Sequence, residues 1–177
     1  VQKLAGSSND TVNLRFSFCR FTALLYLNSF DCTSFIVENC VFDGGYLAVY
    51  WGGPMNRSGV IIRNNVFGTS GSNSSTQDPR DNFIIDHNVF IGTSANSRAI
   101  SNGVNCTISN NVFFGRTIDT TGGLNVGTGC VFLNNITYLC THTLPTVGNS
   151  GSGNINANPQ FLSFPATAAD FNYGHNL

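Results

Sequence analysis

The chain has 177 residues, a length that suits one domain and is long enough to bury a core. Hydrophobic residues make up 41%, charged residues only 10%, and the formal net charge is −1. With a single lysine, Lys3, and no basic run, the sequence lacks the clustered cationic surface that nucleic acid binding requires. No apolar run approaches the roughly 20 residues of a membrane span. We therefore expect neither a nucleic acid partner nor a membrane span.

The two ends of the sequence suggest a division into three parts. Residues 1–13 precede the first repeat and are predicted to be a lead-in or cap, without the pattern of a signal peptide. Residues 14–145 carry the repeats, and residues 146–177 form a closing segment that stops at Leu177 without a polar cap. We expect that a leader has been removed or that the chain belongs to a longer polypeptide.

A segment of eight residues recurs along the chain at intervals of 21, 25, 23, 23 and 24 residues. Its copies, in chain order, are LRFSFCRF (from Leu14), FIVENCVF (Phe35), VIIRNNVF (Val60), FIIDHNVF (Phe83), CTISNNVF (Cys106) and CVFLNNIT (Cys130). No stretch shows a helical apolar period, so the repeat is all-β. The interval matches one turn of a three-sided solenoid, in which each coil contacts only its neighbours.

The columns of the aligned repeat assign its two faces. The first, third and eighth positions are mainly apolar, which places them in the core. The eighth position reads Phe21, Phe42, Phe67, Phe90, Phe113 and Thr137. Residues in register lie about 4.8 Å apart, so these aromatic rings should stack.

The fifth and sixth positions form the turn after the first strand. Asparagine tolerates the left-handed backbone region best after glycine, so the fifth position, with His87 in place of asparagine, is expected to turn the chain. The sixth position is placed inside as an asparagine ladder that continues from Cys19 and Cys40 and contains Asn65, Asn88, Asn111 and Asn135.

This repeat resembles that of the parallel β-helix proteins, namely pectate-lyase-like proteins, polygalacturonases and phage tailspikes. The stretch NPQFLSFPATAADFNYGHNL, from Asn158, is similar to the segment that closes many secreted solenoids of this group. The resemblance covers Leu14 to Leu177 and implies a single-stranded right-handed parallel β-helix of about six to seven coils. The motif is architectural and implies no particular function.

Aromatic residues on the second strand of each coil are candidates for carbohydrate binding. In the resembling enzymes the substrate lies along the sheet that these strands form. Flat rings stack on sugars, and polar groups nearby would orient them. The candidate set is Tyr26, Tyr50, Trp51, Arg98 and Asp119, and ordinary core packing of Tyr50 or Trp51 is the alternative.

The longest insertion, Gly68 to Asn82, carries the weak catalytic candidates Asp78, Arg80 and Asp81. A lyase needs Ca²⁺ or arginine to neutralise a uronate and a base for the α-proton, whereas a hydrolase needs paired carboxyl groups. Ca²⁺ is therefore expected only if the chain is a lyase. No cofactor is otherwise expected, and no spacing of histidine and cysteine indicates a zinc site.

The outward positions of the repeat strand contain two rows. The second position forms an apolar, β-branched stripe that is a candidate interface. The alternative is that β-branched residues occur here only because they favour β-strands. The members of the stripe are Ile36, Ile61, Ile84, Thr107 and Val131. Beside it, Glu38, Arg63 and Asp86 alternate in sign on successive coils. An exposed apolar stripe indicates a contact with another copy, a flanking domain or a loop of the same chain.

Six cysteines favour an extracellular location, but two pairs fall in columns, Cys19 with Cys40 and Cys106 with Cys130. Each pair could form a disulfide or remain a reduced buried stack, and the reduced or partly oxidised state is favoured.

The sequence thus predicts a non-catalytic extracellular, cell-surface or virion-associated solenoid with a glycan-binding or self-assembly face. A polysaccharide lyase or glycoside hydrolase acting on an extracellular polysaccharide is the alternative.

Overall fold

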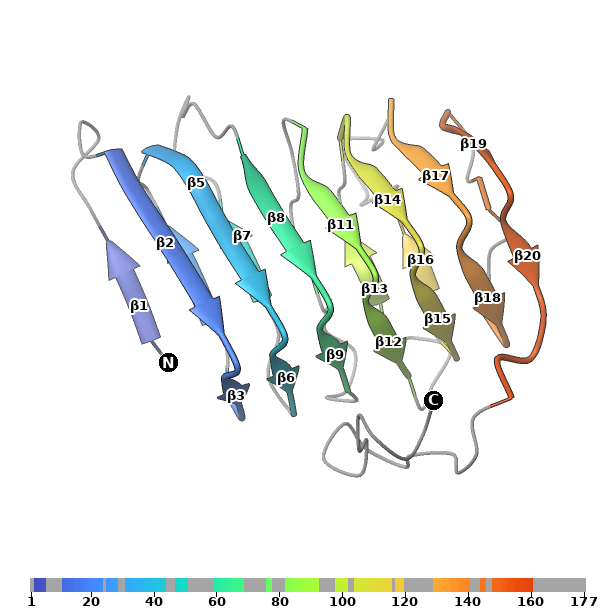
Figure 1. Ribbon diagram of the computed structural model, residues 1–177, viewed down its shortest axis with the longest axis horizontal. Coiled ribbons are helices and arrows are strands. Elements are labelled where there is room, and N and C mark those ends of the chain that lie inside the picture. The colour runs from blue at the N-terminus through green and yellow to red at the C-terminus, as the bar shows by residue number, and fades with distance from the viewer. Residues whose placement is uncertain are drawn as a thin grey trace.

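The computed structural model describes residues 2–5, 11–23, 25–28, 31–43, 47–50, 59–68, 76–77, 82–92, 98–101, 104–115, 117–119, 129–140, 144–145 and 148–160. Within these residues all regular structure is β-strand, and no helix occurs. The strands form three sheets in which every pairing is parallel. The chain visits the sheets in turn as it advances from the N-terminal to the C-terminal end, which makes the structure a parallel β-solenoid (Figure 1).

The first sheet, sheet A, has six strands in the order β1-β4-β7-β10-β13-β16. Their bounds are Gln2–Ala5, Leu25–Asn28, Leu47–Tyr50, Thr76–Gln77, Arg98–Ser101 and Thr117–Asp119. β10 lies inside the segment that the sequence analysis treats as an insertion, so this segment contributes a strand to the sheet.

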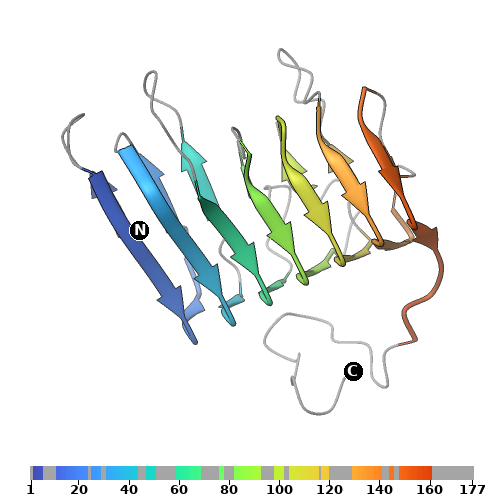
Figure 2. The same cartoon turned by 45° about the horizontal axis from the view of Figure 1, so that its top comes forward.

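Sheets B and C have seven strands each and contain the repeat. Sheet B consists of β2 (Thr11–Ser17), β5 (Asp31–Glu38), β8 (Val60–Arg63), β11 (Ile84–Asp86), β14 (Thr107–Ser109), β17 (Val131–Leu133) and β19 (Ser150–Ser152). Sheet C consists of β3 (Arg20–Phe21), β6 (Val41–Phe42), β9 (Val66–Phe67), β12 (Val89–Ile91), β15 (Val112–Phe114), β18 (Ile136–Tyr138) and β20 (Ile155–Asn156). The strands of sheet B lie side by side in chain order (Figure 2).

The register of the sheets is the register of the sequence repeat. Ile61 pairs with Ile36 on one side and with Ile84 on the other, and the neighbouring positions follow in step. The phenylalanines of the eighth position stack in the core from Phe21 to Phe113, with ring centroids 4.6–5.0 Å apart and planes within 18° of parallel. Burial of these rings and of the aliphatic residues beside them supplies the main driving force for folding.

The asparagines of the sixth position are buried and bonded from coil to coil. The Oδ1 atom of each accepts the backbone N–H of the sixth residue in the preceding coil: the donors Asn65, Asn88 and Asn111 lie 3.0, 2.8 and 2.9 Å from the next side chain. Each Nδ2 atom donates to a backbone carbonyl of the preceding coil, as Asn111 does to Ile85 at 2.9 Å. Both ends of each buried amide are thereby satisfied.

The ladder extends at both ends by different means. At the N-terminal end the thiol of Cys40 takes the acceptor role, with the backbone nitrogen of Cys19 3.4 Å from its sulfur. At the C-terminal end Asn154 accepts the backbone N–H of Asn135 at 3.0 Å, a rung that the repeat alignment does not include. Its coil lacks the apolar signature, because Gly151 stands opposite Phe132 and Asn156 opposite Thr137.

The fifth position has a positive φ in every coil that the structure describes, as the sequence predicts. The residues are Phe18, Asn39, Asn64, His87, Asn110, Asn134 and Gly153, with φ between 52° and 68°. A second left-handed column, absent from the sequence analysis, comes just before the repeat and consists of Gly59, Asn82, Asn105, Gly129 and Gly148. These columns are the corners at which the chain turns into and out of sheet B.

Replacing Asn111 by leucine should destabilise the protein by about 1–3 kcal/mol, because the backbone N–H of Asn88 loses its buried acceptor. Replacement by cysteine should cost less, since sulfur fills the same role in Cys40. Equilibrium denaturation of both variants measures the difference. Equal stability of the leucine variant and the wild type would contradict the role given to the ladder.

Phe18 is the one large apolar residue in the left-handed fifth position, and its side chain is 84% exposed. A side chain other than glycine or asparagine is unfavourable there, and this ring recovers little by burial. We expect Phe18→Asn to raise the free energy of unfolding by about 0.5–1 kcal/mol in denaturant titrations. Phe21→Asn, which removes a ring stacked on Phe42, should lower it, and a destabilised Phe18→Asn variant would show that Phe18 has a packing role.

Candidate functional surface

The outer surface of sheet B, called face B below, carries the apolar stripe identified in the sequence. Its five members occupy adjacent strands in register, so they form a straight row across β5, β8, β11, β14 and β17. Ile84 is 41% exposed, and the other four are half-buried. The structure therefore brings the predicted interface residues Ile36, Ile61, Ile84, Thr107 and Val131 together on one accessible surface.

A charged row runs beside the stripe and consists of Glu38, Arg63 and Asp86 on adjacent strands. Arg63 donates to Oε2 of Glu38 through Nε at 2.9 Å and Nη2 at 2.7 Å. From the other side, Arg15 donates to Oε1 of Glu38 through Nε at 2.8 Å and also through Nη2, and Ser17 adds a bond at 3.1 Å. The carboxylate is thus clamped between two guanidinium groups.

This clamp holds Glu38 ionised. Hydrogen bonds from Arg15 and then Arg63 lower the pKa of Glu38 from 4.5 to about 2, although burial acts in the opposite direction. The alternation of charge along this row is visible in the sequence, but the role of Arg15 is not, because Arg15 stands in the apolar column and reaches diagonally to the neighbouring coil. Its position one coil before Glu38 and two residues from Ser17 was the available signal.

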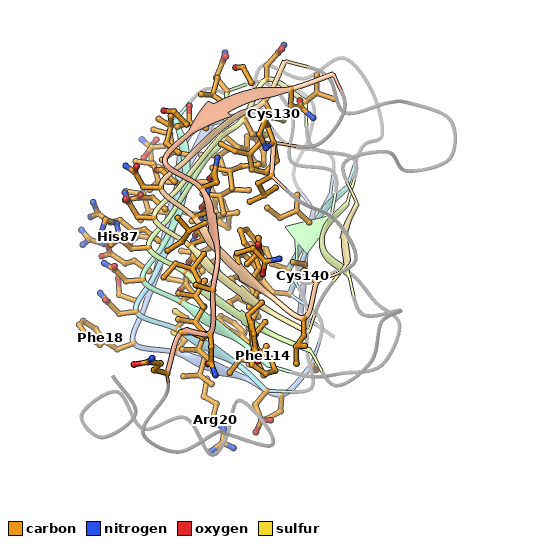
Figure 3. The ribbon with its side chains drawn as sticks, turned by 90° about the vertical axis from the view of Figure 1, so that its right-hand side faces the viewer. Phe18, Arg20, His87, Phe114, Cys130 and Cys140 are labelled. Carbon is orange, nitrogen blue, oxygen red and sulfur yellow. The ribbon has the colours of Figure 1, made fainter. Side chains whose placement is uncertain are left out.

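Asp86 is held by its own group of donors. Its Oδ1 atom accepts hydrogen bonds from Ser109 at 2.6 Å and Asn110 at 2.9 Å, and its Oδ2 atom lies 2.6 Å from Nδ1 of His87. Burial acts to raise the pKa of Asp86, but the bonds from Ser109, His87 and Asn110 outweigh it and the pKa is lowered. His87 points away from the ribbon on the same side as Phe18 (Figure 3).

These carboxylates are poorly suited to acid–base chemistry. Glycoside hydrolysis needs one carboxyl group whose raised pKa lets it act as a general acid. Glu38 and Asp86 both have lowered pKa values and both carry hydrogen-bond donors on their oxygens. Both carboxylates are therefore held ionised, Glu38 in a buried position and Asp86 in a half-buried one.

Four of the five predicted carbohydrate-binding residues fall on sheet A, for which the structure gives the backbone register: Tyr26, Tyr50, Arg98 and Asp119. Tyr26 pairs with Ala48, and Tyr50 pairs with Asn28, so the two tyrosines are offset by two positions. Arg98 pairs with Thr117 and Asp119 with Ser101. Trp51 and the catalytic candidates Asp78, Arg80 and Asp81 lie outside the described residues.

The cysteines of both predicted pairs are reduced in the structure. Burial raises the pKa of the Cys40 thiol to about 11. The pKa of Cys106 is raised by its hydrogen bond with Cys130 and by burial. A thiol with a raised pKa is a weak nucleophile. The sulfur of Cys40 accepts the backbone N–H of Cys19, and the sulfur of Cys130 accepts that of Cys106.

Comparison with known proteins assigns this chain to no family. Neither the protein-family models, the curated proteins nor the solved structures give a match to this chain. Within the described residues no group of three or more histidine, cysteine or acidic side chains is placed to hold a metal ion. The same part of the chain has no helix long and apolar enough to cross a membrane.

The clamp on Glu38 predicts a specific dependence of stability on pH. Because its native pKa is lowered, Glu38 stabilises the fold fully above its ordinary pKa of 4.5, and this contribution is lost as pH falls toward 2. The difference in thermal unfolding midpoint between the wild type and Glu38→Gln should therefore be largest near neutral pH and shrink between pH 4.5 and 2. A difference that stays constant over this range would show that the clamp contributes nothing.

Proposed function

We propose that this protein is a non-catalytic β-solenoid whose function is to present face B as a rigid contact surface. The observation that carries the proposal is the accessible apolar stripe in register over five strands, bordered by ionised side chains that are already fixed by hydrogen bonds. A surface of this kind is ordered before it binds, so binding loses little conformational entropy. The six cysteines of the chain are the feature that favours an extracellular, cell-surface or virion-associated setting.

The expected architecture behind this surface is a right-handed solenoid of about six to seven coils. Two sheets with seven parallel strands support that number. The handedness follows from the strong general preference for right-handed crossovers between parallel strands. The resemblance to pectate-lyase-like and tailspike proteins is consistent with both features and adds no function.

Self-assembly is the leading use of face B, and glycan binding is the second. Assembly is favoured by described side chains, since exposed apolar rows with a polar border are typical of protein–protein contacts. Glycan binding by face B would use the fixed polar row beside the stripe. Tyr26 and Tyr50, in neighbouring strands of sheet A, are candidates for a separate glycan site. Polysaccharide cleavage is the weaker alternative, because the described carboxylates of face B have lowered pKa values.

Ile84→Lys tests the proposal directly. The change puts a charge at the centre of the stripe without emptying the core, so the fold should persist while binding through face B falls at least tenfold. Sedimentation equilibrium would report self-association, and a panel of immobilised neutral and acidic polysaccharides would report glycan binding.

Ile155→Lys is the matched control, since Ile155 is also exposed, at 53%, but belongs to sheet C. It should behave as the wild type in both assays. If Ile84→Lys also matches the wild type in both, face B is not the contact surface and the proposal fails.

A further inference from the structure

We propose that face B binds a second copy of this chain across a two-fold axis that runs parallel to the strands and passes between β8 and β11. This inference rests on the proposed function of face B and names its occupant. It follows from the order in which charged and apolar side chains occur along the solenoid.

The geometry of such an axis is simple. Rotation by half a turn about a line parallel to the strands lays one face B on the other, keeps each column opposite itself and reverses the order of the coils. With the axis between β8 and β11, β8 faces the partner's β11, and β5 faces the partner's β14. The contact is closed, because every interaction occurs twice.

The charged row becomes self-complementary under this operation. Arg63 faces the partner's Asp86, and Asp86 faces the partner's Arg63. The Arg63 side chain is 44% exposed and that of Asp86 is 25% exposed, so both can reach a partner while keeping their own bonds. Arg63 uses only Nε and Nη2 for Glu38, which leaves donors on its guanidinium group.

The apolar stripe is centred on the same axis. Ile61 faces the partner's Ile84 in the middle of the contact, and Ile36 faces the partner's Thr107 on each side. These four positions lie in one column and in consecutive strands, two on each side of the axis. The most exposed member, Ile84, lies next to the axis, where burial in a dimer would be most complete.

Other positions of the axis fit the charges less well. An axis through β8 would set Arg63 against its own copy, and an axis through β11 would do the same to Asp86. An axis between β5 and β8 would pair Glu38 with Arg63 and would set Arg15, on the second strand from the axis, opposite the partner's Ile84. The axis between β8 and β11 moves Arg15 to the third strand, at the edge of the contact, opposite the partner's Val131. Glu38 is also already saturated by Arg15 and Arg63. The position between β8 and β11 avoids like charges in the charged row.

The size of the surface sets the expected affinity. Seven strands spaced by roughly 4.8 Å, each three to eight residues long with alternate side chains facing outward, give a flat area of a few hundred Å² per copy, on the order of half of a standard interface. We therefore expect a reversible dimer with a dissociation constant in roughly the micromolar range.

Reversal of one charge at a time provides the test. In Arg63→Asp the row carries only negative charge near the axis, and in Asp86→Arg only positive charge, so each variant should dimerise at least tenfold more weakly than the wild type. A mixture of the two should form a heterodimer of nearly wild-type affinity, because each aspartate then faces an arginine. Sedimentation velocity with one fluorescently labelled variant measures all three.

Arg63→Gln and Asp86→Asn remove a charge without reversing it. They test the same contact between copies if charge reversal disturbs the clamp on Glu38. Circular dichroism and thermal unfolding establish that each variant is folded, and the neutral variants should weaken the dimer about threefold. If all four variants dimerise as the wild type does, the axis is wrong.

Two further outcomes separate this inference from the proposed function. A wild-type protein that is monomeric up to about 1 mM, with glycan binding that Ile84→Lys abolishes, overturns the dimer and retains face B as a contact surface. A dimer that dissociates in Ile84→Lys but is not rescued by mixing Arg63→Asp with Asp86→Arg retains face B and overturns the two-fold arrangement.

Discussion

The structure depends on one hydrogen bond that repeats from coil to coil, in which a buried side chain accepts a backbone N–H from the preceding coil. An amide oxygen for it is supplied by Asn65, Asn88, Asn111, Asn135 and Asn154, and a sulfur is supplied by Cys40. The bond forms only if equivalent residues lie in register, because one step of slippage would turn the amide to the outside. The ladder therefore fixes which residues become neighbours in every other column, including those far from it.

Face B is a consequence of that register. A solenoid with one fixed register converts a linear order of residues into straight rows, so an alternation of sign along the sequence becomes an alternation along the surface. Apart from the asparagine ladder, the rows of the interior are mainly apolar and stack tightly, as the phenylalanine rings do. Face B combines an apolar row with a charged row, and the charged side chains are hydrogen-bonded within the chain. Its side chains are therefore ordered although they remain accessible.

The sequence predicts those features that repeat and misses those that vary. The left-handed fifth position and the buried sixth position follow from columns of asparagine, because both need a residue type that few others replace. The last coil is not predicted from the repeat, because Gly151 and Asn156 stand where other coils have core residues. Only Asn154, at the sixth position, keeps the residue type of the repeat. The strand at Thr76–Gln77 is equally hidden, because a polar two-residue strand has no periodicity. The contact of Arg15 is hidden for a different reason. Arg15 belongs to the second column and bonds to Glu38 in the fourth, whereas aligned repeats show only neighbours within one column.

In the proposed dimer, the middle of face B is the contact surface between copies of this chain. Methyl NMR of selectively labelled isoleucine tests it most directly, because Ile61 and Ile84 lie at the centre of face B and Ile155 lies on sheet C. As protein concentration rises from about 10 μM to 1 mM, we expect progressive shifts of the Ile61 and Ile84 methyl signals while the Ile155 signal stays in place. Shifts confined to Ile155, or no shift at any isoleucine across this range, would contradict it.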